Sequence, residues 1–177
     1  IREKMVLFLS NLLATEDIEV YFARYAYKYN KLLRDNYLGN YKSLIKSITL
    51  EPKMLIYLNG RLNKKTSPDE NYGRELQELF TVGKGPGSGY TENDVKAAAK
   101  ILTGYSDNIN TVSYTFTSSN HDTTNKQFSS FYGNKVITGK TGVDGQLELD
   151  ELIDMIFSTD EVSKYICRRI YTFFVYY

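Results

Sequence analysis

The spacing of apolar residues along the first third of the chain predicts a run of helices. The expected helices cover residues 3–13, 17–35, 41–50 and 52–58. The first is apolar nearly all round, which is typical of a buried helix. The tyrosines of the second follow its apolar stripe, so core packing explains them better than a carbohydrate-binding platform does.

The helix predicted over residues 67–83 has the strongest start signal in the chain. Ser67 is expected to cap it, the proline that follows suits the first helical position, and Glu70 completes a capping box. Gly83 can supply the left-handed residue that ends such a helix.

A loop with four glycines leads to a further helix over residues 91–104, which Thr91 and Asp94 open with a weaker capping box. The loop follows a helix and lacks Gly-Lys-Ser/Thr, so we interpret it as a connector or lid and not as a nucleotide-binding loop. We expect the two helices to pack together because both have apolar faces. The residues expected at this contact are Leu76, Leu79, Phe80, Val95, Ala99 and Leu102.

The pattern then changes to short strands before helices return. Residues 112–117 alternate between apolar and polar, and residues 127–138 resemble one or two more strands. Helices are expected over residues 147–157 and 162–177, the last one opened by a capping box at Ser158 and Glu161. The expected fold is therefore mainly α, a multi-helix globular domain with a small antiparallel β-hairpin element near 112–138. We expect residues 1–177 to form a single domain and to be a fragment of a longer protein.

Composition narrows the function classes. The 177 residues carry 22 basic and 21 acidic side chains, and this net charge of +1 gives no electrostatic case for binding nucleic acid. No apolar run approaches the roughly 20 residues that a transmembrane helix needs. Cys167 is the only cysteine, so no internal disulfide can form, and we expect a buried, inert thiol.

Charged residues gather on the helix predicted over residues 67–83. Glu70, Arg74 and Glu78 are spaced by four and are binding candidates, either as a carboxylate cluster or as ion pairs along one stripe, worth about 0.2–0.5 kcal/mol each. Arg74 favours the ion-pair interpretation and opposes a metal. Glu75 lies between this stripe and the apolar face, has no obvious local basic partner, and is a catalytic candidate.

His121 and Asp122 are the other catalytic candidates. His121 is the only histidine, which excludes a multi-histidine zinc site within the chain, and no metal or cofactor is indicated. The pair could act as a general base, or it could form a surface turn in which Asp122 bonds the backbone. Our sharpest hypothesis is that this segment folds over the charged helix and brings His121 within reach of Glu75 or Glu78.

Several blocks of the sequence resemble the bacterial domain-of-unknown-function 1800 family (DUF1800). They are REKMVLF at 2–8, LGNYKSLIKSIT at 38–49, EPKMLIYLN at 51–59, ENYGRELQELFTVG at 70–83, YTENDVKAAAKILTGY at 90–105 and HDTTNK at 121–126. The last block ends in Lys126, a further binding candidate. The resemblance implies an exported protein, secreted or periplasmic. Members often carry histidines just after REKM, whereas the matching residues here are Leu9-Ser10-Asn11-Leu12-Leu13.

Two functions remain open at this point. One is a non-enzymatic interaction or scaffold module that binds a protein partner and whose charged motifs are structural. The other is a hydrolase-like enzyme using Glu75, His121 and Asp122. Convergence of these three residues with Arg74 in one cleft would favour the enzyme, and separation would count against it.

Overall fold

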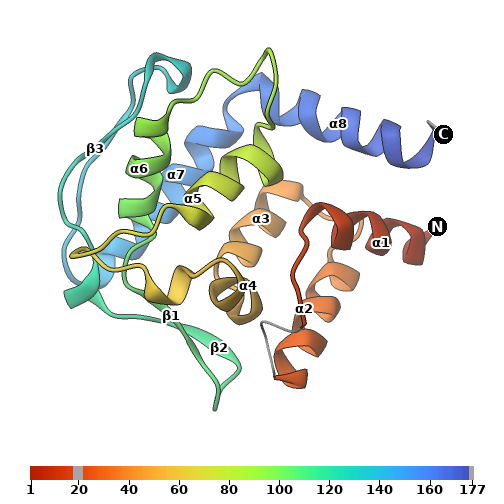
Figure 1. The fold of residues 1–177 in the computed structure, drawn as a ribbon, viewed down its shortest axis with the longest axis horizontal. Coiled ribbons are helices and arrows are strands. Elements are labelled where there is room, and N and C mark those ends of the chain that lie inside the picture. The colour runs from red at the N-terminus through yellow and green to blue at the C-terminus, as the bar shows by residue number, and fades with distance from the viewer. Residues whose placement is uncertain (18–21, 176–177) are drawn as a thin grey trace.

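The computed structural model describes residues 1–17 and 22–175, and it confirms a mainly α fold with small antiparallel hairpins (Figure 1). The helices are α1 (Arg2–Leu12), α2 (Ala23–Asp35), α3 (Tyr41–Thr49), α4 (Pro52–Tyr57), α5 (Asn71–Glu75), α6 (Glu92–Ile101), α7 (Leu147–Phe157) and α8 (Asp160–Phe174). The strands are β1 (Tyr105–Asn108), β2 (Ser113–Phe116), β3 (Lys126–Gln127) and β4 (Val136–Ile137). Among these residues, no helix is long and apolar enough to cross a bilayer.

One large hydrophobic core joins elements from both ends of the described chain. The helices α5, α6 and α7 occupy the middle of the view in Figure 1, with α1 and α8 together on one side. Apolar side chains from all these helices are buried together in that core, which is why segments far apart in sequence are held side by side. Fully buried members include Leu33, Ile45, Met54, Leu76, Ile101 and Leu152.

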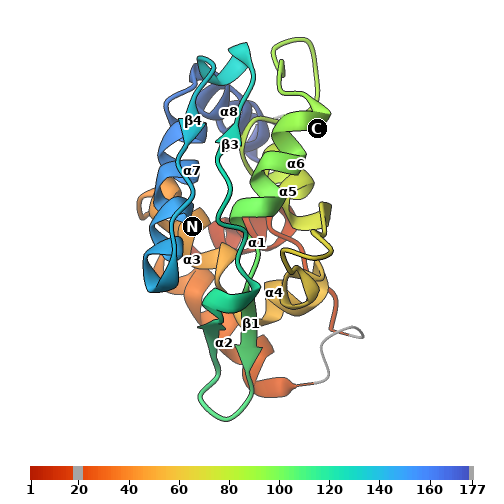
Figure 2. The same cartoon turned by 90° about the vertical axis from the view of Figure 1, so that its left-hand side faces the viewer.

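Two hairpins cover one end and one edge of the helices (Figure 2). Strand β1 pairs with β2 in antiparallel register from Tyr105 opposite Phe116, and β3 pairs with β4. The strand predicted at 112–117 is confirmed, and of the short strands predicted over 127–138, β4 lies within that range while β3 begins one residue before it. Strand β1 was not predicted, because its sequence Tyr-Ser-Asp-Asn has no alternation of apolar and polar residues. Tyr105 is buried against Phe116, with 4.9 Å between ring centroids.

The predicted cap at Ser67 is wrong. The helix begins at Asn71, and the Ser67 amide instead donates to the Lys64 carbonyl in a tight turn, at 2.9 Å. The side chain of Asp69 accepts from the Asn71 amide at 2.9 Å, so an aspartate two residues ahead of the helix satisfies one of its free donors. Glu70 makes no capping hydrogen bond with its side chain.

The charged helix continues past α5 as a π-helix over Leu76–Thr81. The wider turn is visible in the bond from the Val82 amide to the Gln77 carbonyl, five residues back, at 2.9 Å. A π turn holds more residues than an α turn, so the face assignments after Leu76 shift. Phe80 stays buried, but Leu79, predicted to lie in the core, has 46% of its surface exposed.

The predicted contact between this helix and the next one is confirmed. Gly73 on α5 lies so close to α6 that an added Cβ would lie 3.1 Å from the Val95 carbonyl oxygen and 3.2 Å from the Ala99 amide. The capping box of Thr91 and Asp94 is present as predicted. Gly83 has φ +84° and ends the π-helix as expected.

Three further predictions differ from the structure. The Ser158 hydroxyl donates to the Met155 carbonyl at 2.7 Å and closes α7, so it does not cap α8, whose N-cap is Thr159. Cys167 is exposed, because α8 packs only part of its surface against the other helices. Leu7 on α1 is also exposed, so that helix is not buried on all sides. The predicted start of the second helix near residue 17 falls partly on residues 18–21, which lie outside the described residues.

Candidate functional site

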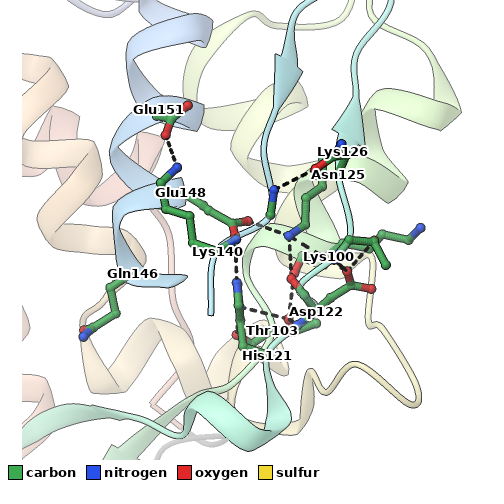
Figure 3. A network of polar contacts seen from close by, with 12 residues as sticks. Lys100, Thr103, His121, Asp122, Asn125, Lys126, Lys140, Gln146, Glu148 and Glu151 are labelled. Atoms are coloured by element: carbon green, nitrogen blue, oxygen red, sulfur yellow. Dashed lines mark hydrogen bonds and ion pairs between the residues drawn. The ribbon is translucent and has the colours of Figure 1, made fainter. Parts of the chain in front are cut away.

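The HDTTNK block forms a buried ionic network with α7 (Figure 3). His121 and Lys126 are each 1% exposed, and Glu148 in the first turn of α7 is fully buried. The Lys126 Nζ lies 2.6 Å from Oε2 of Glu148, and the His121 Nε2 lies 3.2 Å from Oε1. Buried charges are tolerated only when they are paired and hydrogen-bonded, and here they satisfy one another.

Glu148 is the centre of this network. Its Oε1 also accepts from the Lys140 amide at 2.6 Å, so both carboxylate oxygens have donors. Burial alone would raise the pKa of Glu148, but hydrogen bonds from His121, Lys126 and the Lys140 amide lower that pKa below its usual value. The carboxylate is therefore held in its charged form by the protein's own donors.

Both ring nitrogens of His121 face acceptors. The Nδ1 lies 3.0 Å from the Thr103 carbonyl oxygen, which can only accept. The Thr103 hydroxyl gives its proton to the Lys100 carbonyl, at 2.6 Å, so it has no proton for Nδ1. With Nε2 3.2 Å from Oε1 of Glu148, both ring nitrogens face groups of the chain itself, and neither is turned toward a substrate.

The surroundings of the ring are closed as well. Gly145 leaves room for the imidazole, because a Cβ at that position would lie 2.6 Å from Cδ2 of His121. The Phe116 ring packs edge-on against the imidazole with 5.3 Å between centroids. Because Gly145 and Phe116 pack against the imidazole, His121 is a core side chain that a ligand cannot reach.

Asp122 shapes the loop next to this network. Its amide donates to the Thr103 hydroxyl at 2.8 Å, and its side chain accepts from the Thr124 amide at 2.8 Å. Burial would raise the pKa of Asp122, but the Thr124 hydrogen bonds and the charge of Lys126 lower it. The Asx-turn interpretation accounts for Asp122, whereas the surface position it gave to His121 is wrong.

The predicted contact of His121 with Glu75 or Glu78 is wrong. The polar partners of His121 are Thr103 and Glu148, and the block folds against the start of α7 instead of the helix that carries Glu75. The reason is a carboxylate that the sequence interpretation did not consider. Glu148 lies in the acidic stretch LELDELID at the start of a predicted helix, where its place between Leu147 and Leu149 was the available signal.

The stripe of Glu70, Arg74 and Glu78 forms ion pairs. The Arg74 guanidinium binds both oxygens of Glu92 on α6, at 2.7 and 2.6 Å, and lies 3.4 Å from Glu70. Glu78 pairs with Lys84 at 3.0 Å. The ion-pair interpretation is confirmed for Glu70 and Arg74 but wrong for Arg74 and Glu78, because Arg74 instead joins α5 to Glu92 on α6 and Glu78 pairs with Lys84.

Glu75 lies in a different place, a small cavity between α1, α4, the π-helix and α8. The cavity has a volume of about 190 Å³ and is lined by Asn11, Leu12, Ala14, Tyr57, Leu58, Glu75, Leu79, Phe80, Tyr165 and Arg169. The Oε2 of Glu75 is buried and has no hydrogen-bond partner among the described residues. Burial raises the pKa of Glu75, and Glu78 adds to that rise against the charges of Arg74 and Lys84.

Tyr165 lines this cavity and is held in place by contacts with Gly83 and Leu79. The ring of Tyr165 crosses Gly83 so closely that an added Cβ would lie 2.3 Å from it. The Tyr165 hydroxyl donates to the Leu79 carbonyl at 2.8 Å, which ties α8 to the π-helix. Asn11 and Leu12, from the segment where the resemblance implies histidines in other members, lie in the same cavity.

The four residues proposed to converge are therefore divided among three regions: the ion pairs of Arg74, the Glu75 cavity, and the network of His121 and Asp122. Neither Arg74, His121 nor Asp122 lines the Glu75 cavity. Within residues 1–17 and 22–175, no group of three or more histidine, cysteine, aspartate or glutamate side chains could hold a metal ion. The geometry thus favours a structural role for the HDTTNK block and leaves Glu75 as the carboxylate that a ligand could reach.

A family model described as "Protein of unknown function (DUF1800)" matches residues 1–177. The chain belongs to the DUF1800 family. No curated protein and no solved structure matches it. In this DUF1800 member, the buried network also contains Glu148 and Thr103, and the Glu75 cavity also contains Tyr165 and Arg169, none of which was a candidate from the sequence.

Proposed function

We propose that this DUF1800 chain is a non-enzymatic interaction module, exported from the cell, that binds a protein partner. The observation that carries the proposal is the state of His121, which is buried with both ring nitrogens occupied by the chain's own groups. A catalytic histidine needs a free nitrogen within hydrogen-bond reach of a substrate. The charged block therefore supports the fold instead of a reaction.

A protein partner is supported by apolar side chains exposed on α1 and α8. Leu7, Tyr171 and Val175 are each more than half exposed, although Phe8 of α1 packs well against Phe173 of α8. A contiguous group of exposed apolar side chains marks a surface that another polypeptide covers, and we propose that these residues belong to such a surface. Export is the part of the proposal that rests on the family resemblance alone.

Site-specific photo-crosslinking in the cell that makes the protein tests the proposal. A benzophenone amino acid at position 171 or 7 should crosslink to a discrete polypeptide, and fractionation should place that product outside the cytoplasm. Position 143 is the control, because Val143 is even more exposed but lies in the turn before α7. A crosslinking pattern at 171 no different from that at 143 would overturn the proposal.

A further inference from the structure

Glu75 and Arg169 bring opposite charges to one cavity without pairing with each other. The Oε2 of Glu75 is buried and lacks a partner, and Arg169 makes no ion pair or hydrogen bond within the described part of the chain. By contrast, the neighbouring Arg168 lies 3.9 Å from Glu161. The buried Glu75 oxygen is costly unless a donor satisfies it, whereas the exposed guanidinium of Arg169 is open to solvent and to an incoming anion.

The rest of the cavity is small and mainly apolar, although Asn11, Tyr57 and Tyr165 also line it. Leu12, Leu58, Leu79 and Phe80 line it, and its volume is about 190 Å³. An apolar cavity of about 150 Å³ in another protein accommodates benzene, so this one has room for roughly six to eight non-hydrogen atoms. A ligand of that size needs one cationic group, one anionic group and a short apolar part.

We propose that this cavity binds a free α-amino acid with a small aliphatic side chain. The α-ammonium group would donate to Glu75, and the α-carboxylate would bind the Arg169 guanidinium. The side chain would lie against Leu12 and Leu79. This inference goes beyond the proposed function and does not depend on it.

Other ligand classes leave one of the two charges without a partner. A simple cation would face the guanidinium of Arg169, and a simple anion would face the Glu75 carboxylate. A purely apolar ligand would bury the Glu75 oxygen still further without a donor. The remaining charges near Glu75 are Glu78, Arg74 and Lys84, and they sit in the local ion pairs described above.

Binding of L-valine is the direct test, measured by NMR titration of the ¹⁵N-labelled protein. Saturable shifts are expected at Leu79 and Tyr165, whose amides report on the cavity wall. N-acetyl-valine lacks the ammonium group and valinamide lacks the carboxylate, and each is expected to bind at least about tenfold more weakly, as loss of a charged hydrogen bond implies. Equal binding of valinamide would identify a cation site and would overturn the proposal.

Two variants with matched controls complete the test. Glu75→Gln and Arg169→Gln should each weaken L-valine binding by about tenfold or more, whereas Arg168→Gln and Glu70→Gln should leave it unchanged. Arg169 is exposed, so its variant separates loss of binding from loss of folding. An absence of saturable binding to the unaltered protein, or unchanged binding in both cavity variants, would overturn the proposal. The photo-crosslinking expected at position 171 does not depend on whether L-valine binds, so the two proposals can fail independently.

Discussion

The ammonium group of Lys126 lies 2.6 Å from the carboxylate of Glu148, and neither side chain is accessible to solvent. The two residues are 22 positions apart and join the HDTTNK block to the first turn of α7. The block that carried the catalytic candidates His121 and Asp122 therefore has a structural role, because its ion pair joins a hairpin to a helix.

Removing the lysine from this pair should destabilise the protein strongly. Lys126→Met leaves the Glu148 carboxylate buried with one fewer donor, and breaking a buried pair costs about 3–5 kcal/mol. The free energy of unfolding in urea measures the loss. Lys135→Met is the control, because Lys135 is exposed and should change stability by no more than about 0.5 kcal/mol. Equal effects of the two substitutions would contradict a structural role for the pair.

Gly145→Ala should also destabilise the protein, by about 1–3 kcal/mol, because the added methyl group would overlap the His121 ring. Gly85→Ala offers the comparison, since nothing lies within 4 Å of a Cβ at that position. Thermal unfolding of both variants, followed by circular dichroism, gives the answer. A Gly145 variant as stable as the Gly85 variant would mean that the ring does not fill this space.

Glu51 should make stability depend on pH near neutrality. Burial raises its pKa to about 7, only partly offset by Lys28 at 3.6 Å. A carboxyl group with a raised pKa contributes most below its unfolded pKa, near 4.5, and this contribution is lost as pH rises through about 7. The free energy of unfolding should therefore fall between pH 5 and 8, by up to about 3 kcal/mol from this group.

Glu51→Gln should flatten that decline, because the amide does not ionise. Urea unfolding at several pH values would measure both slopes. A variant with the same slope as the unaltered protein would show that another group causes the dependence. Glu16→Gln is a suitable control, because Glu16 is exposed.

Much of the fold could be predicted from periodicity. Residues 147–157 form the predicted helix at the predicted bounds, and α1, α3 and α6 differ from the predictions by only a few residues. Local patterns fail where a tertiary contact overrides them. Ser67 had the best capping sequence in the chain, yet a turn with Lys64 uses its backbone and the helix starts later.

The site could be predicted only in part, for the same reason. The spacing by four correctly indicated the Glu70–Arg74 ion pair, and the expected lack of a local partner for Glu75 agrees with its buried Oε2, which has no hydrogen-bond partner among the described residues. Spacing carries no information about which distant segment reaches His121. That partner is decided by how the hairpin lies on α7, and the face of Leu79 is decided by a π turn with no distinct sequence signal.

The central claim is that His121 is coupled to Glu148 and not to Glu75. Because His121 is the only histidine, the imidazole ¹⁵N and ¹³C resonances of a histidine-labelled sample need no assignment. Glu148→Gln should shift them, while Glu75→Gln should leave them where they are in the unaltered protein. Resonances that respond to Glu75→Gln and ignore Glu148→Gln would contradict the account and restore the catalytic hypothesis.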